Sequence, residues 1–312
     1  MTRAKVGAAL AALTMLVLPA GCGGDDGPSS KESADAQALL EKAFSKQVDS
    51  AEIKLDLKAD LKGLDQLKGP ISLTINGPFK SSGDDQLPVL DWDVRVKLAG
   101  QTIDAGMVVT NDNAYVTLRG QSYEVGEQVF DQLKSSFARQ QKQSGGGQQS
   151  LKQFGIDPTD WLKEPKVEDG EDIGGDSTRR ISGDVDVKKV VEDVLGALRS
   201  PVLRRQLESQ GQALPEVDAA SVEKVTDAIK DVRFEVNVDE DGVARRLFAE
   251  ADFDVPEDTD LGALEGGEIS FGLVLEKVGI DPEIRAPANP QPLGLLLGQF
   301  GLGGGSAIPQ QQ

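Results

Sequence analysis

The only cysteine of this 312-residue chain, Cys22, has the position that most clearly predicts chemistry. It follows two positive charges within the first five residues, an apolar run over Val6–Leu18 and the small residues Pro19–Gly21. This order is typical of a secretory signal. The apolar run is shorter than the roughly 20 residues that a membrane-spanning helix needs. We therefore expect residues 1–21 to be a removable signal that leaves the Cys22 thiol at the new N-terminus.

The residues around Cys22 resemble the lipobox of bacterial lipoproteins, in which the thiol takes a diacylglyceryl group. The sequence departs from the box at one position, because Pro19 stands where leucine is preferred and Leu18 lies one residue earlier. The resemblance implies lipidation of Cys22 and a lipid anchor on the outer face of the cell membrane, since two or three acyl chains hold a protein stably. The alternative is plain secretion with a free thiol, a liability in an exported protein.

The composition excludes most other chemistry. The chain carries 52 acidic and 33 basic residues, a net charge of -19, which disfavours nucleic acid as a partner. It has no histidine, so it lacks the commonest general base and metal ligand. With its one cysteine acylated, it has neither a thiol nucleophile nor a disulfide. We therefore expect no enzyme activity, no cofactor and no metal.

Strict alternation of apolar and polar residues predicts strands over residues 53–61, 71–75, 90–98, 103–109 and 114–118, and later over 177–185, 232–238, 243–255 and 269–275. Turn residues bound each run. Such alternation indicates a sheet with one apolar and one wet face, hence an antiparallel one. The first five strands are expected to form a meander. Asp241-Gly242 predicts a tight hairpin.

Helical spacing predicts helices over residues 33–48, with Ser33 as N-cap, and over 126–141 and 187–198. Two shorter helices are expected over 202–210 and after Pro215. We expect a flexible tether over 22–32, one domain over 33–284, and a disordered Pro/Gly/Leu-rich tail over 285–312. The fold class is thus α+β, an antiparallel sheet covered by a few helices.

No motif predicts catalysis. Asn237–Gly242 matches the first half of a calcium-binding EF-hand loop, but Phe248 replaces the required glutamate, so a hairpin is the interpretation. Trp92 and Trp161, like the tyrosines, are interpreted as core or rim residues. An aliphatic sheet face with 4% aromatics in the chain leaves two alternatives, a packed core or an apolar cavity.

The order of these segments resembles the lipid-binding LppX/LprG-type lipoproteins of actinobacteria, which share the LolA/LolB-like fold. The resemblance is carried by "KQVDSAEIKLDLKADL", "LAGQTIDAGMVVTNDNAYVTLRGQSYEV", "DGEDIGGDSTRRISGDVDVKKVVEDV" and "VNVDEDGVARRLFAEADF". It implies a strongly curved antiparallel sheet, a half-open barrel, with helices covering its concave face. It also implies a cavity for acyl chains of lipids or lipoglycans, which members bind or carry across the cell envelope. Extra segments at Lys134–Ser150 and Ser200–Val217 depart from the family.

We therefore expect a membrane-anchored lipoprotein that binds a lipid or other apolar ligand between sheet and helices. The expected lining residues share the inward parity of the central strands: Leu55, Leu57, Leu73, Val94, Val96, Met107, Val116, Phe234, Val236, Phe271 and Leu273. The alternative is an anchored structural or sensory module with a solid core that binds an unidentified protein of the envelope.

Overall fold

The computed structural model describes residues 30–64, 69–83, 86–143, 157–198, 219–256 and 263–299. Cys22, the expected signal and tether up to residue 29, and the expected helix over 202–210 lie outside these ranges.

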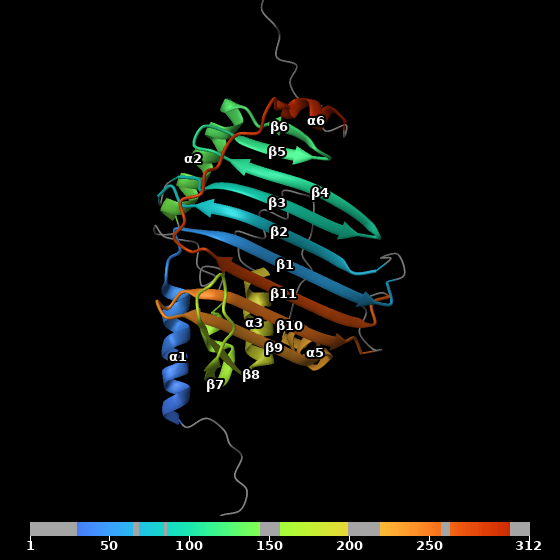
Figure 1. Cartoon of the computed structure of the whole chain (residues 1–312). Coiled ribbons are helices and arrows are strands. Elements are labelled where there is room, and N and C mark those ends of the chain that lie inside the picture. The colour runs from blue at the N-terminus through green and yellow to red at the C-terminus, as the bar shows by residue number, and fades with distance from the viewer. Residues whose placement is uncertain are drawn as a thin grey trace, which may run out of the picture.

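A single mixed sheet of twelve strands dominates the structure (Figure 1). Its strands are β1 (Ser50–Lys62), β2 (Ile71–Lys80), β3 (Val89–Leu98), β4 (Gln101–Val109), β5 (Ala114–Leu118), β6 (Gln121–Glu124), β7 (Leu162–Asp169), β8 (Thr178–Val185), β9 (Ile229–Asp239), β10 (Ala244–Asp254), β11 (Gly266–Glu276) and β12 (Gln291–Pro292). The strand order is β12-β6-β5-β4-β3-β2-β1-β11-β10-β9-β8-β7. All neighbours are antiparallel except β12 and β6. Because β12 and β7 do not pair with each other, the curved sheet stays open, as the expected α+β half-open barrel requires.

Two meanders meet at the centre of this sheet. The predicted run β1 to β5 is confirmed, and so is the later run β9 to β11. They are joined by the long pairing of β1 with β11, from Glu52 opposite Glu276 to Lys62 opposite Gly266. The predicted hairpin at Asp241-Gly242 is also confirmed, and Gly242 has the positive φ of 84° that such a turn favours.

The described helices are α1 (Ser30–Ser45), α2 (Glu127–Gln143), α3 (Val187–Leu198), α5 (Ala219–Ala228), α6 (Leu293–Gln299) and a short 3-10 turn, η2 (Pro158–Asp160). The prediction of Ser33 as N-cap is wrong, because α1 begins three residues earlier. The added turn contains no glycine or proline, and Glu32 favours a helix N-terminus.

Four elements were not predicted. Strand β7 has charged residues on both faces and a register shift between Lys163 and Lys166, so it shows no alternation. The four-residue β6 is too short for a periodicity argument. The segment from residue 285 was expected to be disordered, yet it holds β12 and α6. There the chain runs back along the sheet and pairs Gln291 with Tyr123 of β6, so that β12 becomes the edge strand.

Buried side chains form two separate clusters on one face of the sheet. The first, here called the α1 cluster, packs that helix on strands β7 to β9: Ala36, Leu40, Ala43, Leu162, Ile181, Phe234, Val236 and Val238. The second, the α2 cluster, consists of Phe130 on α2 with Leu90, Val109 and Ala114 of strands β3 to β5. The strands between them, β10, β11, β1 and β2, contribute no member to either buried set.

Candidate ligand-binding site

Register places the expected lining residues on one face. Residues directly opposite in an antiparallel pair point to the same side of the sheet. One row crosses from Leu247 on β10 through Leu273 on β11 and Leu55 on β1 to Ile75 on β2 and Val94 on β3. These five strands therefore carry one continuous apolar surface.

The neighbouring rows complete this face. One runs Phe271, Leu57, Leu73 and Val96. Met107 and Val116 are opposite each other on β4 and β5. On the other side, Phe234 and Val236 are opposite Ala249 and Leu247. All eleven expected residues thus share the face on which α1 and α2 pack.

Exposure divides these eleven residues into two groups. Phe234 and Val236 are 5% and 0% exposed beneath α1, so they pack in a core. The other nine are not fully buried, and Leu57 is 40% exposed. We call the inner-facing side chains of β10, β11, β1, β2 and β3 between the two clusters the trough. Four interstrand spacings make it about 19 Å wide.

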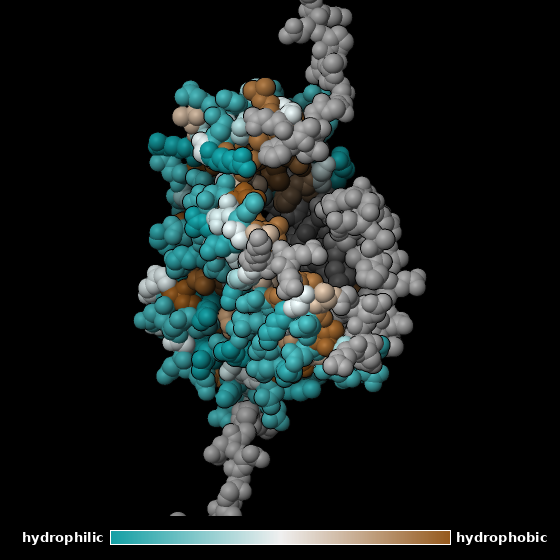
Figure 2. Space-filling model, turned by 90° about the vertical axis from the view of Figure 1, so that its right-hand side faces the viewer, coloured by the Kyte–Doolittle hydropathy of each residue, from teal (hydrophilic) through white to brown (hydrophobic). Residues whose placement is uncertain are grey.

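In Figure 2 the face turned to the viewer is hollowed, with hydrophobic residues in part of its depth and hydrophilic residues along one side. Exposed apolar side chains continue to the end of the trough, where Leu98 and Ile103 are both 45% exposed. A contiguous apolar surface of this kind usually marks a binding surface.

The trough contains no charged side chain among its described residues. Along β1, Ile53, Leu55, Leu57, Ala59 and Leu61 face inward while the alternating lysines and acids face outward. The outer charges are paired across strands, as in Lys54–Glu276 at 2.7 Å and Arg95–Asp104 at 2.6 Å. A surface without charges selects an apolar ligand, because each buried CH₂ contributes about 0.8 kcal/mol.

Trp161, the residue that follows η2, links α3 to the α1 cluster. Trp161 packs edge-on against Phe234, with ring centroids 5.3 Å apart. Its indole Nε1 donates to the buried Asp193 of α3 at 3.0 Å, and Lys189 Nζ donates to the same carboxylate at 2.5 Å. This hydrogen bond raises the pKa of Lys189. A carboxylate with these donors holds α3 beside the α1 cluster.

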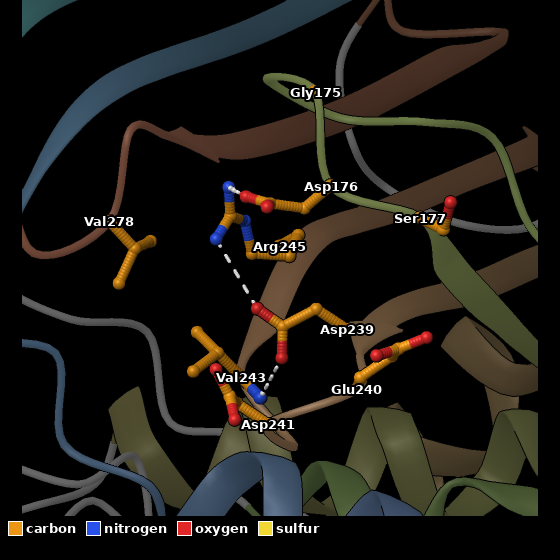
Figure 3. A pocket seen from close by; sticks show the side chains of 9 residues that line it. All are labelled: Gly175, Asp176, Ser177, Asp239, Glu240, Asp241, Val243, Arg245 and Val278. Atoms are coloured by element: carbon orange, nitrogen blue, oxygen red, sulfur yellow. Dashed lines mark hydrogen bonds and ion pairs between the residues drawn. The ribbon is translucent and has the colours of Figure 1, made fainter.

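A second hollow, of about 440 Å³, lies where the β9–β10 and β7–β8 hairpins meet (Figure 3). Asp176, Asp239, Glu240 and Asp241 line it around the buried Arg245. The guanidinium is ion-paired to Asp176 at 2.5 Å and to Asp239 at 3.2 Å, and its Nε donates to the Leu275 carbonyl. These contacts satisfy Arg245 and join three strands, so we interpret the hollow as structural.

Neither a metal centre nor a membrane-spanning helix is found in the described part of the chain. The chain has no histidine, and the acidic residues of the described part form no group of three or more that could hold a metal ion. None of the helices over the described ranges is both long and apolar enough to cross a bilayer.

Comparison with known proteins finds similar folds only among solved structures. No family model and no curated protein matches the chain. LprF from Mycobacterium bovis is 14% identical, with 84% of this chain and 100% of that chain covered and a TM-score of 0.35. The lipoprotein LppX from Mycobacterium tuberculosis is 14% identical over 81% and 99%, with a TM-score of 0.36. A LolA superfamily protein from Nitrosomonas europaea is 11% identical over 81% and 95%, with a TM-score of 0.19.

These neighbours are of the LppX/LprG and LolA types that the sequence resembles. Identities and scores of this size transfer no ligand or activity to the chain.

Proposed function

We propose that this protein is a non-catalytic lipoprotein, anchored through acylated Cys22 to the outer face of the cell membrane, that binds a lipid or another apolar ligand in the trough and carries it across the cell envelope. The observation that supports the proposal most is the division of one sheet face into two buried clusters and an uncharged, partly exposed centre.

Apolar side chains at the centre of the sheet are incompletely buried. An ordinary core fills its interior to crystal-like density, and its central side chains lose nearly all contact with water. Here the central strands keep apolar side chains partly exposed, which leaves hydrophobic free energy to be gained. A long acyl chain supplies that gain without needing a charged partner. Helices α1 and α2, which pack on the sheet through their buried side chains in the two clusters, are then the walls of the site.

A charge placed in the trough tests this proposal. Leu57→Glu introduces a carboxylate on the inner face at a position exposed enough to tolerate it. Ser72→Glu is the matched control, since it adds the same charge on the outer face of the neighbouring strand, opposite Lys58. The assay is binding of a radiolabelled diacylglycerol with two C16 chains to the delipidated chain from Cys22 onward, with Cys22→Ser.

Leu57→Glu is expected to weaken binding by about tenfold or more, because the ligand would bury a carboxylate against hydrocarbon. Ser72→Glu should leave the affinity unchanged. Equal affinities for both variants and the unmodified chain would contradict the trough as the binding site. Absence of binding to the unmodified chain would favour the alternative, a module with a protein partner.

A further inference from the structure

The end of the chain lacks charged side chains, unlike the rest of the protein. Charged residues make up 27% of the sequence, yet none follows Arg285. We call residues 300–312 the tail; they lie outside the described ranges. The tail contains the aliphatic residues Leu302 and Ile308, separated by Gly-Gly-Gly-Ser-Ala. Such an uncharged apolar segment gains hydrophobic free energy when it is buried.

The structure places the start of the tail beside one edge of the sheet. Helix α6 ends at Gln299 and contacts β6 and β12, the last two strands on that side (Figure 1). From β6 the trough begins three strand spacings away at β3, about 14 Å, and its central strand β1 is about 24 Å away. The nine residues from Gln299 to Ile308 span about 30 Å when extended. Ile308 can therefore reach the centre of the trough.

Exposed apolar side chains line the way from this edge to the trough. Ile103 on β4 and Leu98 on β3 are both 45% exposed and do not belong to the α2 cluster. Ile103 is opposite Val96, so it faces the same side of the sheet as the trough. At the centre of the sheet, Leu57 is 40% exposed. An apolar surface that is partly open to water thus continues from β4 to β1.

We propose that the tail docks in the trough when no ligand is bound, with Leu302 and Ile308 against the inner face of β3 to β1, so that a ligand must displace it. This inference rests on the open trough of the proposed function and adds a regulation of that site. Neither surface has a charged side chain, and docking removes apolar area of both from water.

Two further physical points favour the tail as occupant. Because the trough opens to water, the backbone of a docked tail can keep hydrogen bonds to solvent and avoids the cost of burying unpaired polar groups. The covalent connection at Gln299 also gives the tail an effective concentration on the order of millimolar. A modest affinity is then enough for docking.

A spin label on the tail tests docking directly and without a ligand. Gln310→Cys, in the chain from Cys22 onward with Cys22→Ser, carries a nitroxide that broadens the NMR signals of nearby amides. The amides of Leu57 on β1 and Leu73 on β2 report on the centre of the trough. We expect both signals to broaden.

Two double variants of the labelled chain identify what holds the tail. Leu302→Asp with Ile308→Asp places two carboxylates in the proposed contact and should abolish this broadening, because it would bury charge against hydrocarbon. Gln311→Asp with Gln312→Asp is the matched control, since it adds the same charges at polar positions, and it should retain the broadening. All four positions lie outside the described ranges, so no described contact is removed.

Ligand affinity tests displacement of the tail. The assay is binding of the radiolabelled diacylglycerol with two C16 chains. A chain that ends at Gln299 should bind it about tenfold more tightly than the complete chain, the factor expected if about 90% of ligand-free molecules hold the tail in the trough. The variant with aspartates at 302 and 308 should match the shortened chain, and the control variant should match the complete one.

The outcomes separate the two proposals. Diacylglycerol binding of equal affinity in all chains, or equal broadening in both double variants, overturns this inference and leaves the proposed function standing. Broadening that appears when the spin label and the ¹⁵N label are on different molecules also overturns it, because the occupant would be the tail of a second copy. If no chain binds diacylglycerol while the broadening depends on Leu302 and Ile308, tail docking stands and the proposed function fails.

Discussion

Truncation of Leu57 provides the sharpest test of an open trough against a filled core. Leu57 and Leu40 have the same chemistry and opposite environments. Leu40 on α1 is 0% exposed in the α1 cluster, whereas Leu57 on β1 is 40% exposed at the centre of the sheet. Leu57→Ala and Leu40→Ala therefore remove the same three carbon atoms from a core and from a trough.

The magnitudes follow from burial. Three fully buried carbons contribute about 2.4 kcal/mol by transfer, and the cavity left in a close-packed core raises the total to about 3 kcal/mol or more for Leu40→Ala. For Leu57→Ala only about 60% of the transfer contribution applies, which gives about 1.4 kcal/mol. No cavity contribution is expected, because the site already opens to solvent. The two free energies of unfolding should differ by about 1.5 kcal/mol or more.

Urea unfolding followed by circular dichroism measures this difference. The chain must be delipidated first, since a bound ligand would stabilise the folded state and obscure the comparison. A cost of about 3 kcal/mol for Leu57→Ala, equal to that for Leu40→Ala, would refute the reasoning. It would mean that the centre of the sheet is packed like an ordinary core.

Three further predictions concern the framework. Arg245→Met should lower the free energy of unfolding by about 3 kcal/mol in urea melts, because it leaves the buried Asp239 carboxylate unpaired; the same change at the exposed Arg95 should cost under about 1 kcal/mol. Gly242→Ala should cost about 1–2 kcal/mol in the same assay, because φ is 84° there and a Cβ would come within 2.5 Å of a lysine of α1. Asp186 caps α3 and accepts from the Lys189 amide, which lowers its pKa, so Asp186→Ala should cost about 1 kcal/mol at pH 7. This difference in the free energy of unfolding should persist at pH values above 3.8, the pKa of the Asp186 carboxyl in the unfolded chain, and disappear as the pH falls through its lower pKa in the folded chain. A difference that grows on acidification would contradict the prediction.

Alternation allowed most of the sheet to be predicted. Strands such as β1 and β3 have one face against protein or the trough and one face in water, so their sequences carry the period of two directly. The same pattern gave the shared face of all eleven expected lining residues. The alternation could not show which of these eleven residues pack in a core and which line the trough. Phe234 and Val236 have the parity of Leu57, and only the position of α1 distinguishes them.

The missed features depend on contacts distant in sequence. The pairing of β1 with β11 joins segments more than 200 residues apart, and no local pattern encodes it. Strand β7 carries charges on both faces because it is an edge strand. Sequence alone identifies Trp92 only as a core or rim residue, whereas the structure shows its Nε1 buried without a hydrogen-bond partner.

Native mass spectrometry with lipid extraction tests the central claim most directly. The sample is the chain from Cys22 onward, with Cys22→Ser, purified from its native host. The account predicts a discrete excess mass that is lost on delipidation and regained with a defined apolar lipid. A bare protein mass that no lipid changes would contradict it.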